Sequence, residues 1–226
     1  MTTISLTDAA IGTGLGAPVP AMTVELTPGA PTVLAVETDE RPLLVSMMLG
    51  GRLKPDSGSV TIDGSASIDE LRKRTALVDT PVVAEPTAGA RLSIAVAEEF
   101  SFAGLPTSRG AVRRFLRQHD LGDYADLPLR ALPPTARVRL FSELALLRPA
   151  VSVLIITSPE RHGGDPSEWF DSLAAIAERG TTVAIVTDTA TRAILLSLGA
   201  RDALAPAEPS EPSEPSEPDA SESLSA

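Results

Sequence analysis

Residues 54–64 are Lys54-Pro55-Asp56-Ser57-Gly58-Ser59-Val60-Thr61-Ile62-Asp63-Gly64, a stretch that predicts a turn followed by a short strand. An isolated β-hairpin has the same signature, so this stretch alone does not select a fold. Upstream of it, residues 1–35 contain short segments separated by Gly and Pro that predict antiparallel strands. The segments that follow must therefore decide the fold class.

Three apolar or β-branched runs predict strands that are buried on both faces, as in a parallel sheet. They are residues 32–36, 151–156 and 182–186, and each leads towards a predicted helix. Strands and helices that alternate at this spacing are typical of an α/β domain with a mainly parallel sheet. The N-terminal antiparallel strands would form a β subdomain beside this core.

The helices after the last two runs carry end signals. Asp165 is the predicted N-cap of the first helix, Glu168 is the predicted second member of its capping box, and Gly180 ends it. Asp188 is the predicted N-cap of a second helix, which runs to Gly199. Both helices therefore have boundaries that the sequence predicts directly.

The chain divides into a folded domain, residues 1–205, and a tail, residues 206–226. Helical spacing without strand signals at residues 110–118 and 135–148 predicts a helical insertion at about 101–148. In the tail, Glu-Pro-Ser repeats supply acids that repel one another and prolines that remove backbone donors, which predicts disorder. We interpret the tail as solubilising, with a docking or phosphorylation role as the alternative.

Composition excludes several classes of protein. The chain has no cysteine, and His119 and His162 lie too far apart to form a local ligand motif, so we expect no metal site. No apolar run approaches the roughly 20 residues of a membrane span, so we expect no direct membrane insertion and a cytoplasmic location. Six of the 30 acids lie in the tail, and the remaining 24 against 19 bases argue against a nucleic-acid surface.

The order of these segments resembles that of the ATP-binding domains of ABC transporters. Residues 54–64 resemble the segment after the phosphate loop and its helix, and residues 74–78 resemble the approach to the glutamine loop. Residues 132–149 resemble the signature helix, residues 153–156 the Walker B strand, and residues 183–188 the strand before the switch histidine. The resemblance covers residues 1–205 and implies a P-loop NTPase-like core.

Counting back from the quoted stretch places the phosphate loop, whose family pattern is G-x-x-x-x-G-K-[ST], at residues 36–44. The two glycines, the lysine and the hydroxyl residue then correspond to Val36, Arg41, Pro42 and Leu43. Val36 and Arg41 disfavour the positive φ angles that let amides surround a phosphate. Pro42 has neither an ammonium nor a backbone N–H, and Leu43 cannot bind magnesium. By this alignment, every phosphate contact of the loop is lost.

The signature pattern L-S-G-G-Q corresponds to Leu132, Pro133, Pro134, Thr135 and Ala136. Two rigid prolines thus replace the serine that faces the phosphate and the first flexible glycine. The family's composite active sites pair the phosphate loop of one subunit with the signature of its partner. A chain that has lost both halves cannot complete a partner's site through the usual contacts.

The remaining landmarks have lost the same chemistry. Thr157 and Ser158 stand where the family has the Walker B aspartate and the catalytic glutamate, so the magnesium ligand and the general base are both absent. Asp188 stands at the switch histidine, and Asp79-Thr80 lies near the glutamine loop without a glutamine. The resemblance therefore implies no catalytic residues and no ATP or magnesium cofactor.

A retained fold with lost chemistry predicts a catalytically inactive homologue. We expect it to act as a regulatory or scaffolding subunit beside a membrane permease or an active ATPase paralogue, in the cytoplasm or at the inner face of the membrane through that partner. One alternative is a functional ATP-binding subunit with an unorthodox site in which Arg41 substitutes for the lysine. Another is a domain that binds a non-nucleotide small molecule in the old cleft, beside Glu37, Asp39, Arg41 and Asp188.

Overall fold

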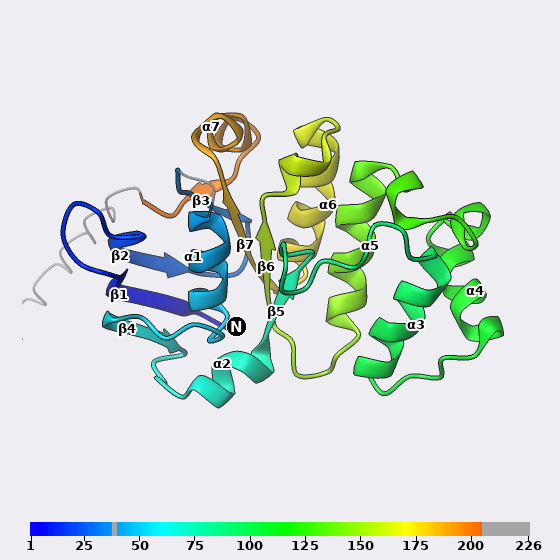
Figure 1. The fold of residues 1–226 in the computed structure, drawn as a ribbon, viewed down its shortest axis with the longest axis horizontal. Coiled ribbons are helices and arrows are strands. Elements are labelled where there is room, and N and C mark those ends of the chain that lie inside the picture. The colour runs from blue at the N-terminus through cyan, green and yellow to red at the C-terminus, as the bar shows by residue number, and fades with distance from the viewer. Residues whose placement is uncertain (38–39, 205–226) are drawn as a thin grey trace, which may run out of the picture.

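The computed structural model describes residues 1–37 and 40–204, so the predicted tail and Asp39 lie outside the described residues. Figure 1 shows two β-sheets at one end of the molecule and a group of helices at the other. The predicted fold class is confirmed: an α/β domain with a parallel sheet, an antiparallel β subdomain and a helical part.

The antiparallel sheet has the strand order β2-β1-β4. Its strands are β1 (Ile4–Ile11), β2 (Val19–Leu26) and β4 (Ser57–Ile62). The quoted stretch therefore pairs with β1, about fifty residues earlier, and does not form a local hairpin. Gly58 has φ 72° and lies so close to the β1 backbone that a Cβ would sit 2.2 Å from the Asp8 carbonyl oxygen. Only glycine fits there, because any side chain would clash with backbone.

The parallel sheet has the strand order β5-β6-β7-β3-β8. Its strands are β3 (Thr32–Ala35), β5 (Thr75–Val78), β6 (Val153–Thr157), β7 (Thr182–Thr187) and β8 (Arg201–Asp202). The three predicted central strands are confirmed within two residues at each end. Alternate residues of β3, β5, β6 and β7 enter different cores, as with Val33 and Leu34, which explains why these strands are mainly apolar.

Helices cover both faces of this sheet. Helix α1 (Arg41–Leu49) lies between the parallel and antiparallel sheets, while α6 (Pro166–Glu178) and α7 (Thr189–Ser197) cover the opposite face. Asp165 and Asp188 cap α6 and α7 as predicted. The capping-box prediction for Glu168 is wrong, because its carboxylate accepts a hydrogen bond from Thr135 of another helix. That tertiary contact outweighs the local one.

The helical part contains α3 (Leu92–Phe102), α4 (Arg109–Gln118) and α5 (Pro134–Leu146). It therefore begins at Leu92, ahead of the predicted boundary near residue 101. Helix α3 escaped prediction because Arg91 provides no side-chain cap, and its first residues form an apolar run without helical spacing. The remaining elements are α2 (Ile68–Arg74) and three short 3-10 turns at Gly122–Tyr124, Leu129–Ala131 and Pro159–His162.

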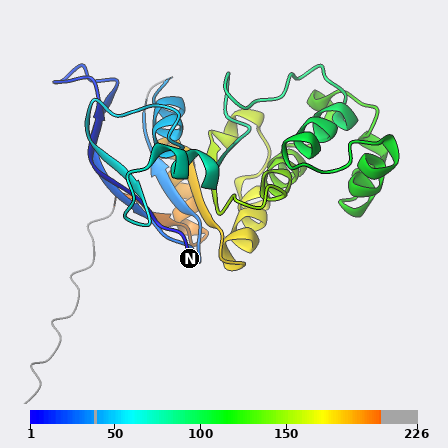
Figure 2. The same cartoon turned by 90° about the horizontal axis from the view of Figure 1, so that it is seen from below.

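The helical part shares one hydrophobic core with the parallel sheet, while the antiparallel sheet belongs to a second core on the other face of that sheet. Residues of α3, α4 and α5 belong to the same buried cluster as one face of the parallel sheet. Trp169 of α6 is fully buried within it. The view turned by 90° shows the helical part at the opposite end of the molecule from the antiparallel strands (Figure 2). None of the described helices has the length and apolar character needed to cross a bilayer.

Candidate functional site

The carboxyl ends of β3, β5, β6 and β7 lie along one edge of the sheet, where ligands bind in open α/β folds. The edge brings together the predicted site residues Val36, Thr157, Ser158 and Asp188. Backbone bonds fix their spacing: Val36 N donates to Thr187 O at 2.9 Å, and Ser158 N donates to Val186 O at 2.8 Å. The residues that align with the family's nucleotide site are therefore neighbours in space.

At the predicted phosphate loop, α1 begins at Arg41 and has Pro42 and Leu43 in its first turn. The N-cap residue Glu40 makes no side-chain cap. The Arg41 guanidinium is directed towards the β1–β2 loop, with Nε 2.7 Å from Pro18 O and Nη2 3.3 Å from Ala17 O. The positive charge nearest the helix start is therefore bound to backbone carbonyls of another element.

Three hydroxyls meet where β5 and β6 end against α1. Thr157 Oγ1 donates to Ser46 Oγ at 2.7 Å, and Thr80 Oγ1 lies 2.8 Å from Thr157 Oγ1. Because the single Thr157 proton is directed to Ser46, Thr80 is the donor in the second bond. All three side chains are at most 1% exposed. The Thr157 hydroxyl is thus buried in a chain of three hydrogen-bonded hydroxyls, which we call the closed hydroxyl chain, and it is not exposed at the sheet edge.

The predicted signature segment lies on the opposite side of β6, at the start of α5. Leu132 is buried, Pro133 is the N-cap of α5, and Pro134 is its first residue, a position that suits proline. Thr135 Oγ1 donates to Glu168 Oε2 at 2.9 Å, which ties α5 to α6, and Ala136 packs against the core. The segment therefore serves to begin a helix and connect it to its neighbour.

The predicted switch position, Asp188, accepts a bond from Thr191 N at 2.6 Å as the cap of α7. Nearby, Thr189 Oγ1 donates to Glu37 Oε1 at 2.5 Å, and Thr187 Oγ1 donates to Glu160 Oε2 at 2.7 Å. Burial raises the pKa of Glu160 above its usual range, and the neighbouring Asp188 carboxylate adds to the rise. The hydrogen bond from Thr187 lowers that pKa but does not outweigh burial. The carboxylates of Glu37, Glu160 and Asp188 therefore gather at this end of β7.

A second cluster, which sequence reasoning missed, surrounds Asp79 at the end of β5. Arg137 of α5 holds both Asp79 carboxylate oxygens, each at 2.7 Å, and both side chains are 5% exposed. Arg161 lies 3.5 Å from Asp79 and from Glu85. His162 Nε2 lies 2.8 Å from Asp79 Oδ2 without the alignment of a hydrogen bond. The Asp79 cluster therefore joins β5, α5 and the turn after β6.

At the centre of the Asp79 cluster, the charges of Asp79 and Arg137 neutralise each other. Burial alone would raise the pKa of Asp79, but the contacts with Arg137, His162 and Arg161 outweigh it and hold that pKa below its usual range. Burial likewise opposes the charged form of Arg137, yet Asp79 raises the pKa of its guanidinium. Asp79, Glu85 and His162 are close enough to surround a cation. The two arginines already supply the positive charge there, which disfavours a metal ion.

The only sequence signals for this cluster were Asp79 beside the glutamine-loop position and Arg137 after the signature. Neither could be paired in advance, because 58 positions separate them. At the sheet edge itself, the described residues comprise buried hydroxyls, carboxylates and an arginine bound to carbonyls. Such a set can hold elements together, and its two hydroxyl–carboxylate contacts, from Thr187 to Glu160 and from Thr189 to Glu37, connect neighbouring segments.

The sequence matches no family model and no curated protein. Solved structures do match. A nucleotide-free ATP-binding cassette from an ABC transporter is 15% identical, with TM-score 0.64 over 87% of this chain and 85% of that one. CbiO1 from Clostridium perfringens, part of the ABC transporter complex CbiONQ, is 17% identical, with TM-score 0.57 over 82% and 77%.

A bacterial Atm1-family ABC exporter, solved with ATP bound, is 13% identical, with TM-score 0.57 over 81% of this chain and 34% of that one. Identities this low show the fold and leave the activity open. The chain therefore has the fold of the ATP-binding domains of ABC transporters.

Proposed function

We propose that this chain is a catalytically inactive relative of the ABC ATPases that acts as a regulatory or scaffolding subunit through protein contacts. The observation that carries the proposal is the closed hydroxyl chain of Ser46, Thr80 and Thr157. In the family alignment, Thr157 occupies the position of the acid that would help to hold magnesium. A sealed, neutral hydroxyl cannot replace a carboxylate that faces a metal-bound nucleotide.

The start of α1 supports the same proposal. Pro42 lacks both the lysine ammonium and a backbone N–H, and Leu43 lacks a hydroxyl, so three ordinary phosphate and magnesium contacts have no donor or ligand. Each missing charge-assisted contact costs about 1.5–3 kcal/mol, so three of them lower affinity by at least about three powers of ten. Nucleotide binding in the family manner would then be negligible at cellular concentrations.

The unorthodox alternative, in which Arg41 replaces the lysine, receives no support from its contacts. Arg41 uses Nε and Nη2 on the carbonyls of Pro18 and Ala17. To reach a phosphate it would have to give up both bonds and enter a site that already contains Glu37 and Asp188. We therefore favour the inactive reading over the functional ATP-binding subunit.

A role through protein contacts follows from what the fold retains. The shared core and the Asp79 cluster keep the helical part attached to the sheet, although the site chemistry is lost. ATP-binding domains of this fold occur as parts of membrane transporters, as with CbiO1 in its complex. We propose a permease or an active paralogue as the partner.

Isothermal titration with Mg-ATP at millimolar concentration tests the proposal, with an active ABC ATPase as the positive control. We expect no saturable heat for this chain. Saturable binding with a dissociation constant below about 1 mM would overturn it. If such binding occurred and disappeared in Arg41→Ala, the unorthodox site would be the correct interpretation. If it survived that substitution, both readings of the phosphate loop would be wrong.

A further inference from the structure

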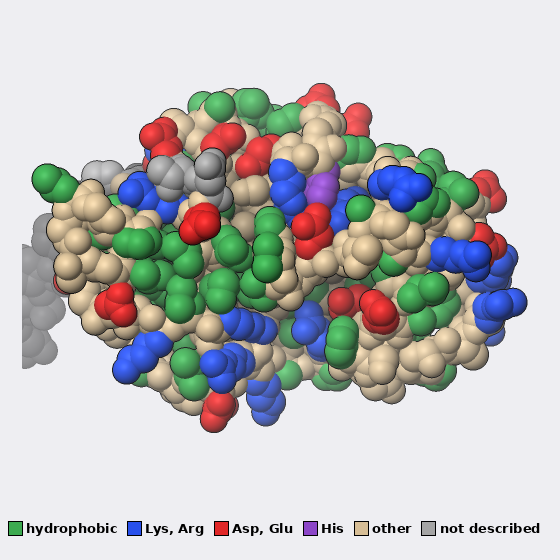
Figure 3. Space-filling model, viewed as in Figure 1, with side chains coloured by type: hydrophobic (Ala, Val, Ile, Leu, Met, Phe, Trp, Pro, Cys, Tyr) green, Lys and Arg blue, Asp and Glu red, His purple; other side chains and the backbone are tan. Residues whose placement is uncertain are grey.

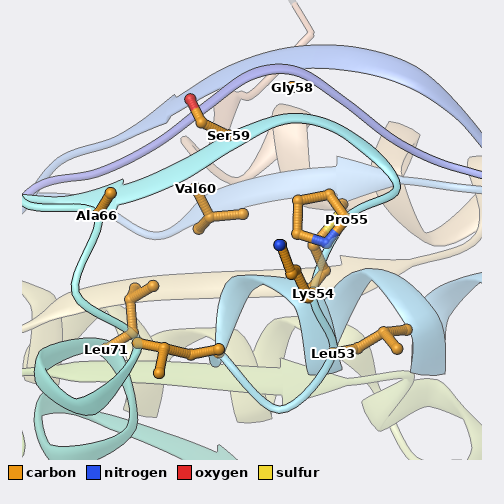
Figure 4. A pocket seen from close by; sticks show the side chains of 11 residues that line it. Leu53, Lys54, Pro55, Gly58, Ser59, Val60, Ala66 and Leu71 are labelled. Carbon is orange, nitrogen blue, oxygen red and sulfur yellow. The ribbon is translucent and has the colours of Figure 1, made fainter.

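A cavity of about 320 Å³ opens between the end of α1, β4 and α2, at the other end of α1 from Arg41. The described side chains that line it are mainly apolar, and Lys54 is the one charged residue among them. In Figure 4, the Lys54 side chain lies among these apolar groups, beside Val60 and Pro55. The apolar lining residues are Met48, Leu53, Val60, Ala66, Ile68 and Leu71. We call this hollow the Lys54 pocket.

Further positive charge adjoins the Lys54 pocket. Arg72 Nε donates to the carbonyl of Gly51, a lining residue, at 2.8 Å. Arg52 follows Gly51 and donates to Thr75 O at 3.1 Å and to the carbonyl of Arg72. Within residues 1–37 and 40–204, no carboxylate lies within 4.0 Å of Lys54, Arg52 or Arg72. Figure 3 shows Lys and Arg side chains gathered over α2 at the edge of an apolar area.

These three cations therefore make no ion pair among the described residues, although Asp69 and Glu70 lie in the first turn of the helix that carries Arg72. Burial, together with repulsion from Arg148 and Arg72, lowers the pKa of Arg52 to about 10. Like charges that are held together without a counter-ion raise the free energy of the folded chain and attract an anionic group. An apolar hollow with a basic rim fits a segment that carries acids around one apolar side chain.

The chain itself contains a segment of that chemistry. Residues 205–226 have six acids, no basic residue and one large apolar side chain, Leu224. Glu222 and Asp219 lie close to Leu224 in sequence. A leucine side chain fits comfortably within 320 Å³, and its acidic neighbours would then lie near the basic rim.

The segment is also long enough. Leu224 comes twenty positions after Leu204, the last described residue, and an extended chain spans about 3.3 Å per residue, or roughly 66 Å. A globule of this size has a radius of gyration of about 17 Å. The tail therefore reaches the Lys54 pocket within one molecule, and closing such a loop costs little more than closing a shorter one.

We propose that the acidic tail docks intramolecularly on the Lys54 pocket, with Leu224 in the hollow and Glu222 and Asp219 on the basic rim. The docked tail covers the apolar side chains at this end of α1 and neutralises the adjoining arginines. It thereby occupies a surface that a protein partner of similar chemistry would otherwise use. This inference is independent of whether the chain binds nucleotide.

The full chain allows a direct test, because it contains no native cysteine. A nitroxide attached to Ser223→Cys should broaden the amide signals of the lining residues in ¹⁵N-labelled protein. Leu224→Ala should lower the ratio of docked to free tail about tenfold, because burying a leucine is worth more than 1 kcal/mol over alanine. Raising the salt concentration to 1 M should weaken docking, since screening then acts within about 3 Å.

An arginine of the helical part provides a matched control. Lys54→Glu should reduce the broadening several-fold, whereas Arg114→Glu, the same charge change at an exposed residue of α4 outside the pocket, should have a smaller effect. Dispersed amide spectra of both variants confirm folding. Absent broadening in the parent chain, or equal effects of the two substitutions, would overturn the proposal. A mixed sample tests whether docking is intramolecular: it contains spin-labelled chain without ¹⁵N and ¹⁵N-labelled chain without the nitroxide. Broadening in this sample would overturn the intramolecular form, since a second copy would then supply the tail.

Discussion

The Asp79–Arg137 pair connects the sheet to the helical part, and Asp79→Asn tests its importance. Asp79 has φ 50°, a left-handed conformation that asparagine also tolerates, so the substitution removes charge without new backbone strain. It leaves Arg137 without the partner that holds it through two bonds of 2.7 Å at 5% exposure.

The expected loss follows from that burial. Breaking a buried ion pair by removing one partner costs about 3–5 kcal/mol, because the remaining charge loses its main counter-charge. Among the described residues, Arg137 would keep only the longer ion-pair contact with Glu85, at 3.7 Å. Arg161 also contacts Asp79, so part of the cost comes from its repulsion of Arg137. For a chain of this length, each kcal/mol lowers the melting temperature by about 2–4 °C. We therefore expect a decrease of roughly 6–20 °C.

Urea denaturation, followed by circular dichroism, measures the change in the free energy of unfolding. Arg113→Met is the matched control, because its pair with Asp126 is 44% and 63% exposed and should contribute no more than about 1 kcal/mol. In the double variant Asp79→Asn with Arg137→Met, most of the loss should be recovered, since no unpaired buried charge remains. An Asp79→Asn loss no larger than that of Arg113→Met would refute the reasoning.

The pH dependence provides an independent check. The pKa of Asp79 is lower in the folded chain than its ordinary value near 3.8, so the pair contributes fully above that pH. Its contribution is lost as the pH falls below 3.8 through the folded-state pKa. The difference in stability between the parent chain and Asp79→Asn should therefore shrink below pH 3.8 and stay constant above pH 5. A constant difference down to pH 2 would contradict this assignment.

Three other substitutions test the site and the core. Thr157→Asp introduces the family's acid, but it buries a carboxylate between Ser46 and Thr80, so we expect a lower melting temperature and no heat of Mg-ATP binding in titration calorimetry. Thr157→Val, which removes the hydroxyl at similar volume, is its control. Asp188→Ala removes the α7 cap and should cost about 1 kcal/mol in urea denaturation, with Asp188→Asn close to neutral; equal losses would exclude capping. Leu173 lies in the fully buried face of α6, so Leu173→Ala should lower the free energy of unfolding by about 2–5 kcal/mol. Ala174→Gly in the same helix should lower it by no more than about 1 kcal/mol, the cost of helix propensity alone. Equal losses would mean that packing does not dominate there.

Much of the fold could be predicted because its signals are local. The runs that became β3, β6 and β7 are apolar or β-branched at nearly every position, since both of their faces are buried, and this pattern is visible without any partner. The caps Asp165 and Asp188 depend on residues two or three positions away. The residue types at the aligned phosphate loop, such as Pro42, are likewise properties of the sequence alone.

The sequence by itself thus determined the α/β class and the strand runs, and it supplied the prediction that the aligned positions lack the family's chemistry. Only the tertiary structure decided what the remaining side chains do. Ser46 meets Thr157 across 111 positions, and Arg137 meets Asp79 across 58. The Lys54 pocket likewise needs α1, β4 and α2 together. The physical reason is that burial and hydrogen-bond partners at such separations depend on how the elements pack, whereas strand and helix signals arise within a few residues.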